Sequence, residues 1–382
     1  MLRNTKVVLF LLLLMSFAGV QAGAITPNPT APSVAAKAYI LMDYDSDRVL
    51  AEQNADERLP PASITKLMTS YVVSHELHAG NIQLDDEVLI SEKAWRMVGS
   101  RSFIEVNTKV SVEALLRGMI VQSGNDAAVA LAEHIAGSEE TFAQMMNQYA
   151  QQLGMLDTNY RNATGLPDPE HYTTARDIAT LSAALIRDFP EHYEWYSEKE
   201  YTYNGITQHN RNKLLWRDNS VDGLKTGHTE AAGYCLAASA KRGDMRLISV
   251  VLGTRSENAR AQEIQKLFNY GFRFFETHQL YQASDSITDT KVWKGTQRQL
   301  ALGLANNLSV TVPRGQYKDL VASTNIQQPV IAPVMAGTEL GEVEIRLGDD
   351  VIAKQSLVAL TTIEAGSWWR RLIDEILLLI WG

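Results

Sequence analysis

The sequence predicts an α+β fold in which one sheet, assembled from distant parts of the chain, is covered by helices. Strand patterns occur at both ends of the first part of the chain, and helical periodicity lies between them. After about residue 283 the helical period gives way to short β-type runs punctuated by Gly and Pro, which predicts a second, all-β domain. The chain ends in an amphipathic helical pattern.

The elements of the first domain follow from local patterns. Tyr39–Met42 and Val49–Ala51 flank an aspartate-rich segment, which predicts a strand, a turn and a second strand. Two more strands are predicted at Gly233–Ala240 and Arg246–Leu252. Apolar residues recur at helical spacing over residues 63–77, 112–119, 126–136, 141–153, 175–187 and 259–275.

Composition excludes some classes of protein. The chain has 382 residues, a hydrophobic fraction of 45% and a net charge of −9, which is typical of a two-domain globular protein. No run of Lys and Arg interleaved with aromatic residues occurs, so we expect no nucleic-acid partner. The single cysteine, Cys235, lies in an apolar run and is predicted to be a buried thiol.

The N-terminus has the pattern of a cleaved export signal. Arg3 and Lys6 precede an apolar stretch, Val7–Val20, and small residues follow at 22–24. We predict a signal peptide over residues 1–24 and a leader over 25–37 that begins near Ile25. The alternative is a retained membrane anchor, but the apolar run is shorter than the roughly 20 residues that a spanning helix needs.

The C-terminal segment, residues 365–382, is predicted to be a membrane-surface helix. Its apolar side carries two tryptophans among aliphatic residues, and Arg370, Arg371, Asp374 and Glu375 lie on the other side. The alternative is a terminal helix docked on the protein's own body. The predicted catalytic domain covers residues 38–282 and the all-β domain residues 283–364.

The first chemical motif is Ser63-Ile64-Thr65-Lys66. Prolines end a loop just before Ser63, and the i,i+3 spacing places Ser63 and Lys66 on one face of a first helical turn. Burial near the positive end of the helix dipole disfavours the ammonium form, so Lys66 can act as a neutral base toward Ser63. The alternative is that Ser63 only caps the helix and that Lys66 is a solvated charge.

Two further motifs follow in order. Ser123-Gly124-Asn125 precedes a helix-forming run and is predicted to form a turn whose side chains point into a cleft, or else a simple capping turn. Lys225-Thr226-Gly227 fits an edge strand with a small residue where a ligand backbone approaches, although a solvated loop lysine would explain it too.

Taken together, the three motifs resemble those of the low-molecular-mass penicillin-binding proteins that are serine D-alanyl-D-alanine carboxypeptidases of the bacterial envelope. The resemblance covers nearly the whole chain, including the helix end at Gly271–Glu276, the β domain and the amphipathic tail. It implies a β-lactamase/transpeptidase-like sheet covered by helices, a peptidoglycan stem peptide as substrate, β-lactams as inhibitors, and no cofactor or metal. It also implies a location on the periplasmic face of the inner membrane, to which the tail helix binds.

The resemblance also implies residue roles. Ser63 attacks the carbonyl between two D-alanines, Lys66 accepts its proton, and Ser123 passes a proton to the leaving amine. Substrate-binding roles fall on a larger set. These residues are Asn125, Lys225, Thr226 and Gly227, with His228, whose N–H would share the oxyanion hole with that of Ser63, and Arg260.

Several alternatives stay open at this point. Arg260 and Arg211 match positions where the family keeps arginines near the site, but a structural ion pair explains either equally well. A β-lactamase would share the first steps, yet the Glu-x-x-Leu-Asn pattern is absent; D,D-endopeptidase action is closer in chemistry. A catalytically silent wall-binding scaffold is a third possibility. His75 and His78 lie within one helical turn but lack a third metal ligand, which favours two surface histidines.

Overall fold

The structure is a computed structural model that describes residues 30–381. The predicted signal peptide, residues 1–24, lies outside the described residues, as does the start of the predicted leader. Within the described part of that leader, Val34 is buried and joins an apolar cluster of the fold. The segment next to the first strand therefore packs onto the domain.

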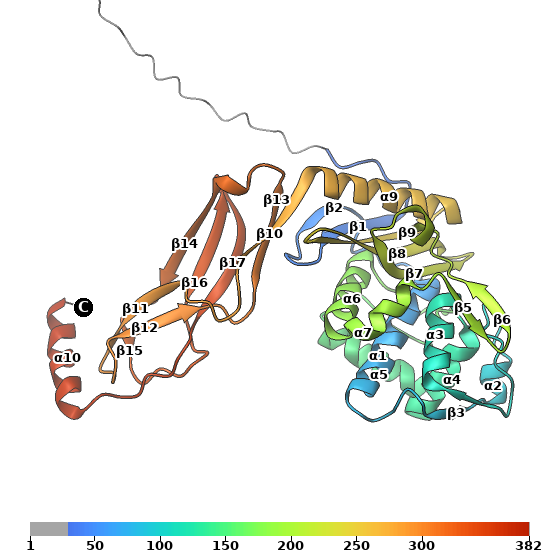
Figure 1. Cartoon of the computed structure of the whole chain (residues 1–382), viewed down its shortest axis with the longest axis horizontal. Coiled ribbons are helices and arrows are strands. Elements are labelled where there is room, and N and C mark those ends of the chain that lie inside the picture. Colours follow the sequence, from blue (N-terminus) through green and yellow to red (C-terminus); the bar gives the residue numbers. More distant parts are fainter. Residues whose placement is uncertain (1–29, 382) are drawn as a thin grey trace, which may run out of the picture. The chain divides into compact units, whose positions relative to one another are not determined.

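The first part of the chain is built on a five-stranded antiparallel sheet with the order β2-β1-β9-β8-β7 (Figure 1). The two N-terminal strands pair with β9, which comes late in the chain, as the sequence predicted. The strands are β1 (Ala38–Asp43), β2 (Val49–Gln53), β7 (Val221–Thr229), β8 (Gly233–Arg242) and β9 (Met245–Thr254).

Helices cover both faces of this sheet (Figure 1). Ile40 faces one side and packs in the larger cluster with the helices of the middle of the chain, whereas Leu41 faces α9 (Glu257–Phe274). The strands are therefore buried on both faces, which explains their continuous apolar runs. The remaining helices are α1 (Lys66–His78), α2 (Glu92–Trp95), α3 (Val112–Gln122), α4 (Asn125–Ala136), α5 (Glu139–Gln152), α6 (Ala175–Asp188), α7 (Pro190–Tyr193) and α8 (Leu214–Arg217).

Side-chain caps fix where the long helices begin. In α3, α5, α6 and α9 a Ser or Thr hydroxyl accepts a hydrogen bond from a backbone N–H three residues on, which satisfies one of the free donors of the first turn. The capping residues are Ser111, Ser138, Thr174 and Ser256. These boundaries lie within a few residues of the predicted ones.

Short elements between the long helices were not predicted from the sequence. Two small hairpins, β3 (Glu87–Leu89) with β4 (Lys109–Ser111) and β5 (Glu200–Tyr203) with β6 (Ile206–His209), lie beside the helices. Each strand has only three or four residues, which is too short for an alternating pattern to show.

Beyond α9 the chain is built of strands, as predicted. Its main sheet has six strands in the order β14-β16-β17-β12-β11-β15, and a separate ladder joins β10 to β13. β10 begins before the predicted boundary at residue 283 and pairs with a strand beyond it. The strands are β10 (Phe275–Tyr281), β11 (Thr288–Trp293), β12 (Gln299–Gly303), β13 (Leu308–Pro313), β14 (Leu320–Ile326), β15 (Val330–Ile331), β16 (Glu339–Leu347) and β17 (Asp350–Ala359), with a short 3₁₀ helix η3 (Tyr317–Asp319).

A buried carboxylate links the turn after β1 to the β10–β13 ladder. The Asp43 carboxylate accepts a hydrogen bond from the Thr277 hydroxyl at 2.6 Å and another from the Ser46 hydroxyl at 2.9 Å. Thr311 completes the network through hydroxyl contacts with Ser46 at 2.6 Å and Thr277 at 2.9 Å. Because Asp43 is fully buried, these hydrogen bonds satisfy a charge that water does not reach.

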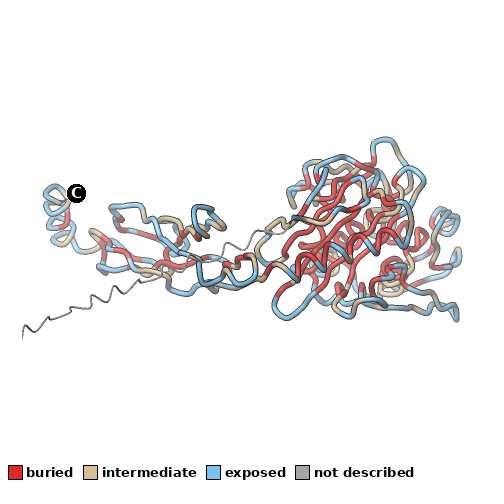
Figure 2. Tube along the Cα trace, turned by 90° about the horizontal axis from the view of Figure 1, so that it is seen from above, coloured by how far each residue is buried: buried red, intermediate tan, exposed pale blue. Residues whose placement is uncertain are grey.

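The chain ends in helix α10 (Trp368–Trp381), whose two sides have different environments. The acidic side contacts the β domain: Asp374 accepts the Lys294 N–H at 2.6 Å, and Glu375 forms an ion pair with the Lys294 ammonium. The apolar side is exposed (Figure 2), with Trp368 at 62% and Leu379 at 82% of their full exposure. No helix within residues 30–381 is long and apolar enough to cross a membrane.

Two smaller predictions concern single residues. Cys235 is fully buried on β8, as expected, and burial raises the pKa of its thiol to about 11. His75 and His78 were interpreted as surface histidines; His75 is instead half-buried, and its Nδ1 lies 2.7 Å from the Tyr149 hydroxyl. Within residues 30–381 no group of three or more His, Cys, Asp or Glu side chains is arranged to hold a metal ion.

Candidate active site

Ser63 and Lys66 lie at the start of a helix that runs through the domain. Residues Ala62–Thr65 form a 3₁₀ turn, η1, which continues directly into α1. In this turn the Lys66 ammonium donates to the Ser63 hydroxyl at 3.2 Å. The predicted nucleophile and base are therefore in hydrogen-bond contact, as the i,i+3 spacing implied.

Lys66 is buried, with 1% of its surface exposed, and this changes its acid–base behaviour. Its Nζ also donates to Asn125 Oδ1 at 2.7 Å and to the Thr164 carbonyl at 2.6 Å. Burial, together with the nearby Arg211 cation, lowers its pKa to about 7, and the negative charge of Asp126 limits the drop. A large neutral fraction is therefore present at neutral pH, which a base needs in order to take the proton of a serine.

The second motif forms a tight connection between two helices. α3 ends at Gln122, Ser123 adopts a left-handed conformation with φ of 68°, and α4 begins at Asn125. The Ser123 hydroxyl is buried and has no hydrogen-bond partner among residues 30–381. Asn125 is held by a hydrogen bond from its Nδ2 to the Val98 carbonyl at 2.6 Å. The turn thus directs an unpaired hydroxyl and a fixed amide toward the same region as Ser63.

The third motif lies on β7, which is the edge strand of the sheet, as predicted. β7 pairs with β8 on one side, and η1 packs against it. A Cβ atom at Gly227 would lie 2.9 Å from the Pro61 carbonyl oxygen and 3.2 Å from the Ala62 Cβ, so glycine permits this close approach. The absence of a side chain at this position lets the strand and the catalytic turn lie next to each other.

Lys225 is buried, with 3% of its surface exposed. It donates to the Thr226 carbonyl at 3.2 Å. Burial and the neighbouring cations Lys66, Arg211 and Arg260 hold its pKa well below the usual lysine value. Its predicted contact with a substrate carboxylate stays a prediction.

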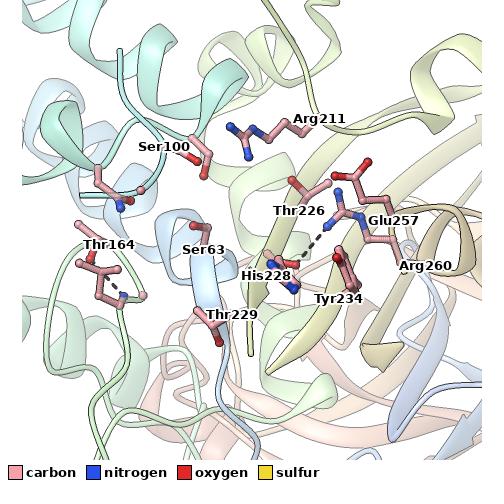
Figure 3. Close-up of a pocket in the computed structure, with 16 residues that line it drawn as sticks. Ser63, Ser100, Thr164, Arg211, Thr226, His228, Thr229, Tyr234, Glu257 and Arg260 are labelled. Atoms are coloured by element: carbon pink, nitrogen blue, oxygen red, sulfur yellow. Dashed lines mark hydrogen bonds between the residues drawn. The ribbon is translucent and has the colours of Figure 1, made fainter. Parts of the chain in front are cut away.

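Two arginines mark one end of the site (Figure 3). Arg260, on the first turn of α9, is buried and donates to the Gly227 carbonyl at 3.1 Å. Its guanidinium lies 5.8 Å from the centre of the Tyr234 ring, on which the His228 ring stacks at 3.9 Å. The Arg260 guanidinium therefore contacts strand β7 and an aromatic ring, and the charge of Glu257 acts on it as well. The alternative role considered for Arg260 was a structural ion pair. Among the described residues, its hydrogen bond goes to a backbone carbonyl and not to a carboxylate.

All of these groups converge on one cavity of about 350 Å³. Seven of the nine predicted site residues line it, and the other two, Lys66 and Lys225, each donate a hydrogen bond to a lining residue. The lining residues from the prediction are Ser63, Ser123, Asn125, Thr226, Gly227, His228 and Arg260, and Arg211 joins them.

A loop that was not predicted from the sequence lines the back of the site. The Thr164 carbonyl accepts from Lys66, and Gly165 has φ of +81°. A Cβ at Gly165 would lie 1.8 Å from the Ala62 carbonyl oxygen, so no other residue fits. The Asn162 Oδ1 fixes the loop by accepting the Gly165 N–H at 2.7 Å. The run Asn-Ala-Thr-Gly between two predicted helices is the signal that could have indicated it.

Glu257 is a second missed residue, on the same helix turn as Arg260. It lines the cavity, and a hydrogen bond from Lys213, at 2.9 Å, holds the pKa of its carboxyl below the usual range. A carboxylate beside two arginines reduces the net positive charge at that end of the site. It has no motif of its own, since glutamate at the start of a helix is common.

The comparison with known proteins agrees with this arrangement. Residues 25–256 match the family described as Peptidase S11, D-alanyl-D-alanine carboxypeptidase, and residues 275–365 match the C-terminal domain of penicillin-binding protein 5. The D-alanyl-D-alanine carboxypeptidase DacC of Escherichia coli K12 is 46% identical over 91% of this chain and 89% of its own length.

Solved structures give the same result. Penicillin-binding protein 5 of Haemophilus influenzae has a TM-score of 0.85 and 43% identity, and the match covers 88% of this chain and 99% of that one. Penicillin-binding protein D2 of Listeria monocytogenes, in an ampicillin-bound form, has a TM-score of 0.59 and 32% identity over 64% of this chain and 100% of that one.

The chain thus belongs to the peptidase S11 family of D-alanyl-D-alanine carboxypeptidases. It is a serine-type carboxypeptidase with the penicillin-binding fold followed by an all-β domain, as its motifs predicted.

Proposed function

We propose that Ser63 is the nucleophile that removes the terminal D-alanine from peptidoglycan stem pentapeptides. The 3.2 Å contact between its hydroxyl and the buried Lys66 amine is the observation that carries this proposal. Neutral Lys66 takes the Ser63 proton as Oγ attacks the carbonyl carbon between the two D-alanines. The backbone N–H groups of Ser63 and His228 hold the oxyanion.

Collapse of the tetrahedral intermediate needs a proton on the leaving nitrogen. The Lys66 ammonium supplies it through the Ser123 hydroxyl, whose lack of a partner among the described residues leaves it free to bridge to the substrate. D-alanine departs and leaves an ester on Ser63. Water then attacks the ester with Lys66 as base, which releases the shortened peptide and restores the serine. A β-lactam would form the same kind of ester when its ring amide opens.

Substrate orientation follows from the charges of the cavity. Arg260 and Arg211 lie at one end, with the Thr226 hydroxyl between them and Ser63 (Figure 3). A C-terminal carboxylate would bind there, because a buried cation attracts it and the hydroxyl donates to it. Asn125 would hold the peptide amide on the acyl side, and Lys225 would add positive charge to the same end of the site.

The test is a pair of assays on the mature protein. Ser63→Ala should lose both covalent labelling by a fluorescent penicillin and D-alanine release from a pentapeptide, and Lys66→Arg should lose most of both, since a guanidinium stays protonated. Ser323→Ala, on an exposed strand of the β domain, is the matched control and should keep both. A Ser63→Ala protein that retains either activity would remove Ser63 as nucleophile.

We further propose that the protein is exported and that α10 binds the periplasmic face of the bacterial inner membrane. The support is the separation of its two sides: the acidic side is tied to Lys294, and the tryptophan-bearing side is exposed. Tryptophans beside aliphatic residues suit the boundary between headgroups and acyl chains.

Vesicle binding tests this proposal. The protein should sediment with phosphatidylethanolamine/phosphatidylglycerol vesicles, and Ile376→Lys should reduce the bound fraction severalfold because it places a charge among buried acyl chains. Val321→Lys, a similar change at an exposed valine of β14, should bind as the parent does. Equal binding of the parent and Ile376→Lys would exclude α10 as the anchor.

A further inference from the structure

Arg211 reaches the catalytic cavity from a short segment that belongs to no helix or strand (Figure 3). This segment, residues 210–213, joins β6 to α8. Among the described residues no carboxylate pairs with the Arg211 guanidinium, and a neutral amide, that of Gln122, lies 3.2 Å from one of its nitrogens. A single neutral contact does not fix a long side chain, so the place of the guanidinium depends on the backbone that carries it.

Buried asparagines stand on both sides of Arg211 and fix that backbone. Asn210 has 7% of its surface exposed and Asn212 has 0%. A buried amide is costly unless its atoms are hydrogen-bonded, and here they are. The Asn210 Oδ1 accepts the Asn212 N–H at 2.9 Å, and its Nδ2 donates to the Glu198 carbonyl at 2.9 Å. The bend that carries the arginine is thus closed by a side chain of its own.

Asn212 bonds this bend to two other elements at once. Its Oδ1 accepts the Leu214 N–H at 3.1 Å, at the start of α8, and its Nδ2 donates to the Gly223 carbonyl on β7 at 3.0 Å. An amide side chain can do both, whereas a leucine of similar shape can do neither and a serine hydroxyl is too short to span both partners. One buried side chain therefore sets the distance between the bend and the edge strand.

Strand β7 is held in this way on both sides of Lys225. The Gly223 carbonyl, two residues before Lys225, accepts from Asn212, and the Gly227 carbonyl, two residues after it, accepts from Arg260. Each of the segments that bring an arginine to the cavity is thus bonded to the strand of the third motif. The spacing of the two guanidinium groups around that strand depends on these two hydrogen bonds.

We propose that Asn212 is a positioning residue, which holds Arg211 at the carboxylate end of the site by bonding its segment to β7. Arg211 touches the substrate, and Asn212 acts only through it. This assignment rests on the proposed function, because it takes the contact between Arg211 and the substrate carboxylate from there.

The first experiment compares two substrates, a pentapeptide that ends in D-alanyl-D-alanine and its C-terminal amide, which lacks the carboxylate. We expect the parent to prefer the acid by about tenfold or more in kcat/KM. Arg211→Leu should lower kcat/KM for the acid about tenfold, mainly through KM, and for the amide less than about twofold. Asn212→Leu, which adds no charge, should lower the acid value about three- to fivefold with the same selectivity.

A double variant separates positioning from a general effect on the fold. If Asn212 acts through Arg211, Asn212→Leu has nothing left to displace once Arg211 is gone. The double variant should therefore have the same kcat/KM for the acid as Arg211→Leu alone. A residue that only supported the fold would give losses that multiply.

The pH profile of penicillin acylation gives a second readout. The positive charge of Arg211 helps to lower the pKa of Lys66, whereas Asp126 and Glu139 act in the opposite direction and are unchanged in these variants. Moving the guanidinium away from Lys66 should raise that pKa. The acid limb of the acylation profile should therefore shift to higher pH in Asn212→Leu, in the same direction as in Arg211→Leu.

Two further variants control for folding. In Asn212→Ser the hydroxyl still accepts the Leu214 N–H but does not reach the Gly223 carbonyl, so α8 keeps its start and only the link to β7 is lost. It should show the same selective loss, and it decides the question if Asn212→Leu does not fold. Ser249→Ala removes a fully buried hydroxyl that donates to the Ile40 carbonyl at 3.2 Å; it should lower the melting temperature and leave both readouts unchanged.

The outcomes distinguish this role from the catalytic assignment. If the Asn212 variants keep the preference of the parent for the acid, or if the losses multiply in the double variant, Asn212 is not a positioning residue while the carboxypeptidase assignment stands. If Arg211→Leu itself keeps that preference, Arg211 does not bind the carboxylate and the role of Asn212 is wrong with it. A parent that neither binds penicillin nor releases D-alanine would refute the proposed function.

Discussion

At the scale of single residues, the chemistry of this protein depends on moving one lysine out of water. Lys66 makes three hydrogen bonds and has almost no exposed surface, and the cost of burying its charge brings its pKa to about 7. An amine with this pKa exchanges protons readily with serine and with a leaving amine at neutral pH. The environment of the lysine therefore replaces the histidine that other serine hydrolases use.

The pKa of Lys66 predicts a pH profile for acylation. Only the neutral amine accepts the Ser63 proton, so the rate constant for penicillin acylation should rise about tenfold per pH unit below 7 and level off above about pH 8. Stopped-flow or gel-based labelling between pH 5 and 9 measures it, with circular dichroism as the control for folding. A flat profile across this range would contradict the role of Lys66 as the base.

A second residue-scale prediction concerns Gly165. Gly165→Ala should abolish most acylation and lower the free energy of unfolding by about 2 kcal/mol or more, because its Cβ would lie 1.8 Å from the Ala62 carbonyl oxygen, next to Ser63. Gly154 has a similar φ of +78° with open space around it, so Gly154→Ala should cost only about 1 kcal/mol and retain activity. Urea unfolding and penicillin labelling measure both effects, and equal behaviour of the two variants would refute this explanation.

Individual residues also show how far the sequence could predict the site. Ser63, Ser123 and Thr226 belong to motifs with fixed spacing, and such motifs can be read without coordinates. The Thr164 contact could not be predicted in this way, because it uses a backbone carbonyl, which every residue carries. Glu257 was also missed, since its place at the cavity depends on where α9 begins.

At the scale of elements, α9 connects the active site to the apolar cluster that lies between this helix and the sheet. Its buried face packs on the sheet through residues such as Ile264 and Phe268, and its first turn carries Arg260 into the cavity. The Ser256 cap fixes where that turn begins, because its Oγ accepts the Ala259 N–H at 3.1 Å. The position of the arginine thus depends on a helix cap.

The cap can be tested with a matched pair of serines. Ser256→Ala and Ser138→Ala each remove a hydroxyl that accepts an N–H at 3.1 Å, so each should lower the free energy of unfolding by about 1 kcal/mol. Only Ser256→Ala should also raise the KM for a D-alanyl-D-alanine peptide, since only its helix carries Arg260. Steady-state kinetics measures KM, and chemical denaturation measures the free energy of unfolding. An equal KM in the two variants would contradict the dependence of the Arg260 position on the Ser256 cap.

The long elements were predictable because each repeats a signal over many residues. The helix α6 and the strand β8 both lie close to their predicted ranges, since the helical period of α6 extends over 14 residues and the apolar run of β8 lies within a strand of 10 residues. The hairpins of β3 to β6 lack such a length, and their pairing depends on segments that are distant in sequence. The sequence pattern therefore predicts the scaffold better than the loops that surround the cavity.

At the scale of the whole molecule, the catalytic sheet and the β-rich part are joined by the hydroxyl network of Asp43, Ser46, Thr277 and Thr311. The predicted fold, an α+β sheet followed by a β domain, is confirmed, but this network could not be predicted. Threonine and serine on strands are frequent, and nothing local distinguishes those that face a buried carboxylate.

This network predicts a separation between stability and catalysis. Thr277→Val leaves the buried Asp43 carboxylate one donor short and should lower the free energy of unfolding by about 1–3 kcal/mol, with penicillin labelling unchanged. Thr324→Val on the exposed face of β14 is the matched control and should change stability by less than about 0.5 kcal/mol. Differential scanning calorimetry of the two variants provides the measurement, and similar melting curves for both would show that the hydroxyl has no structural role.

The strand order β2-β1-β9-β8-β7 has a consequence for biosynthesis. The serine-bearing helix is translated early, yet the central strand that β1 needs, and the edge strand beside Ser63, emerge only near the end of the catalytic domain. Any chain interrupted before that point lacks both, so a ribosome that stalls or a protease that cuts early yields an inert polypeptide. Carboxypeptidase activity therefore arises only once the complete catalytic fold exists.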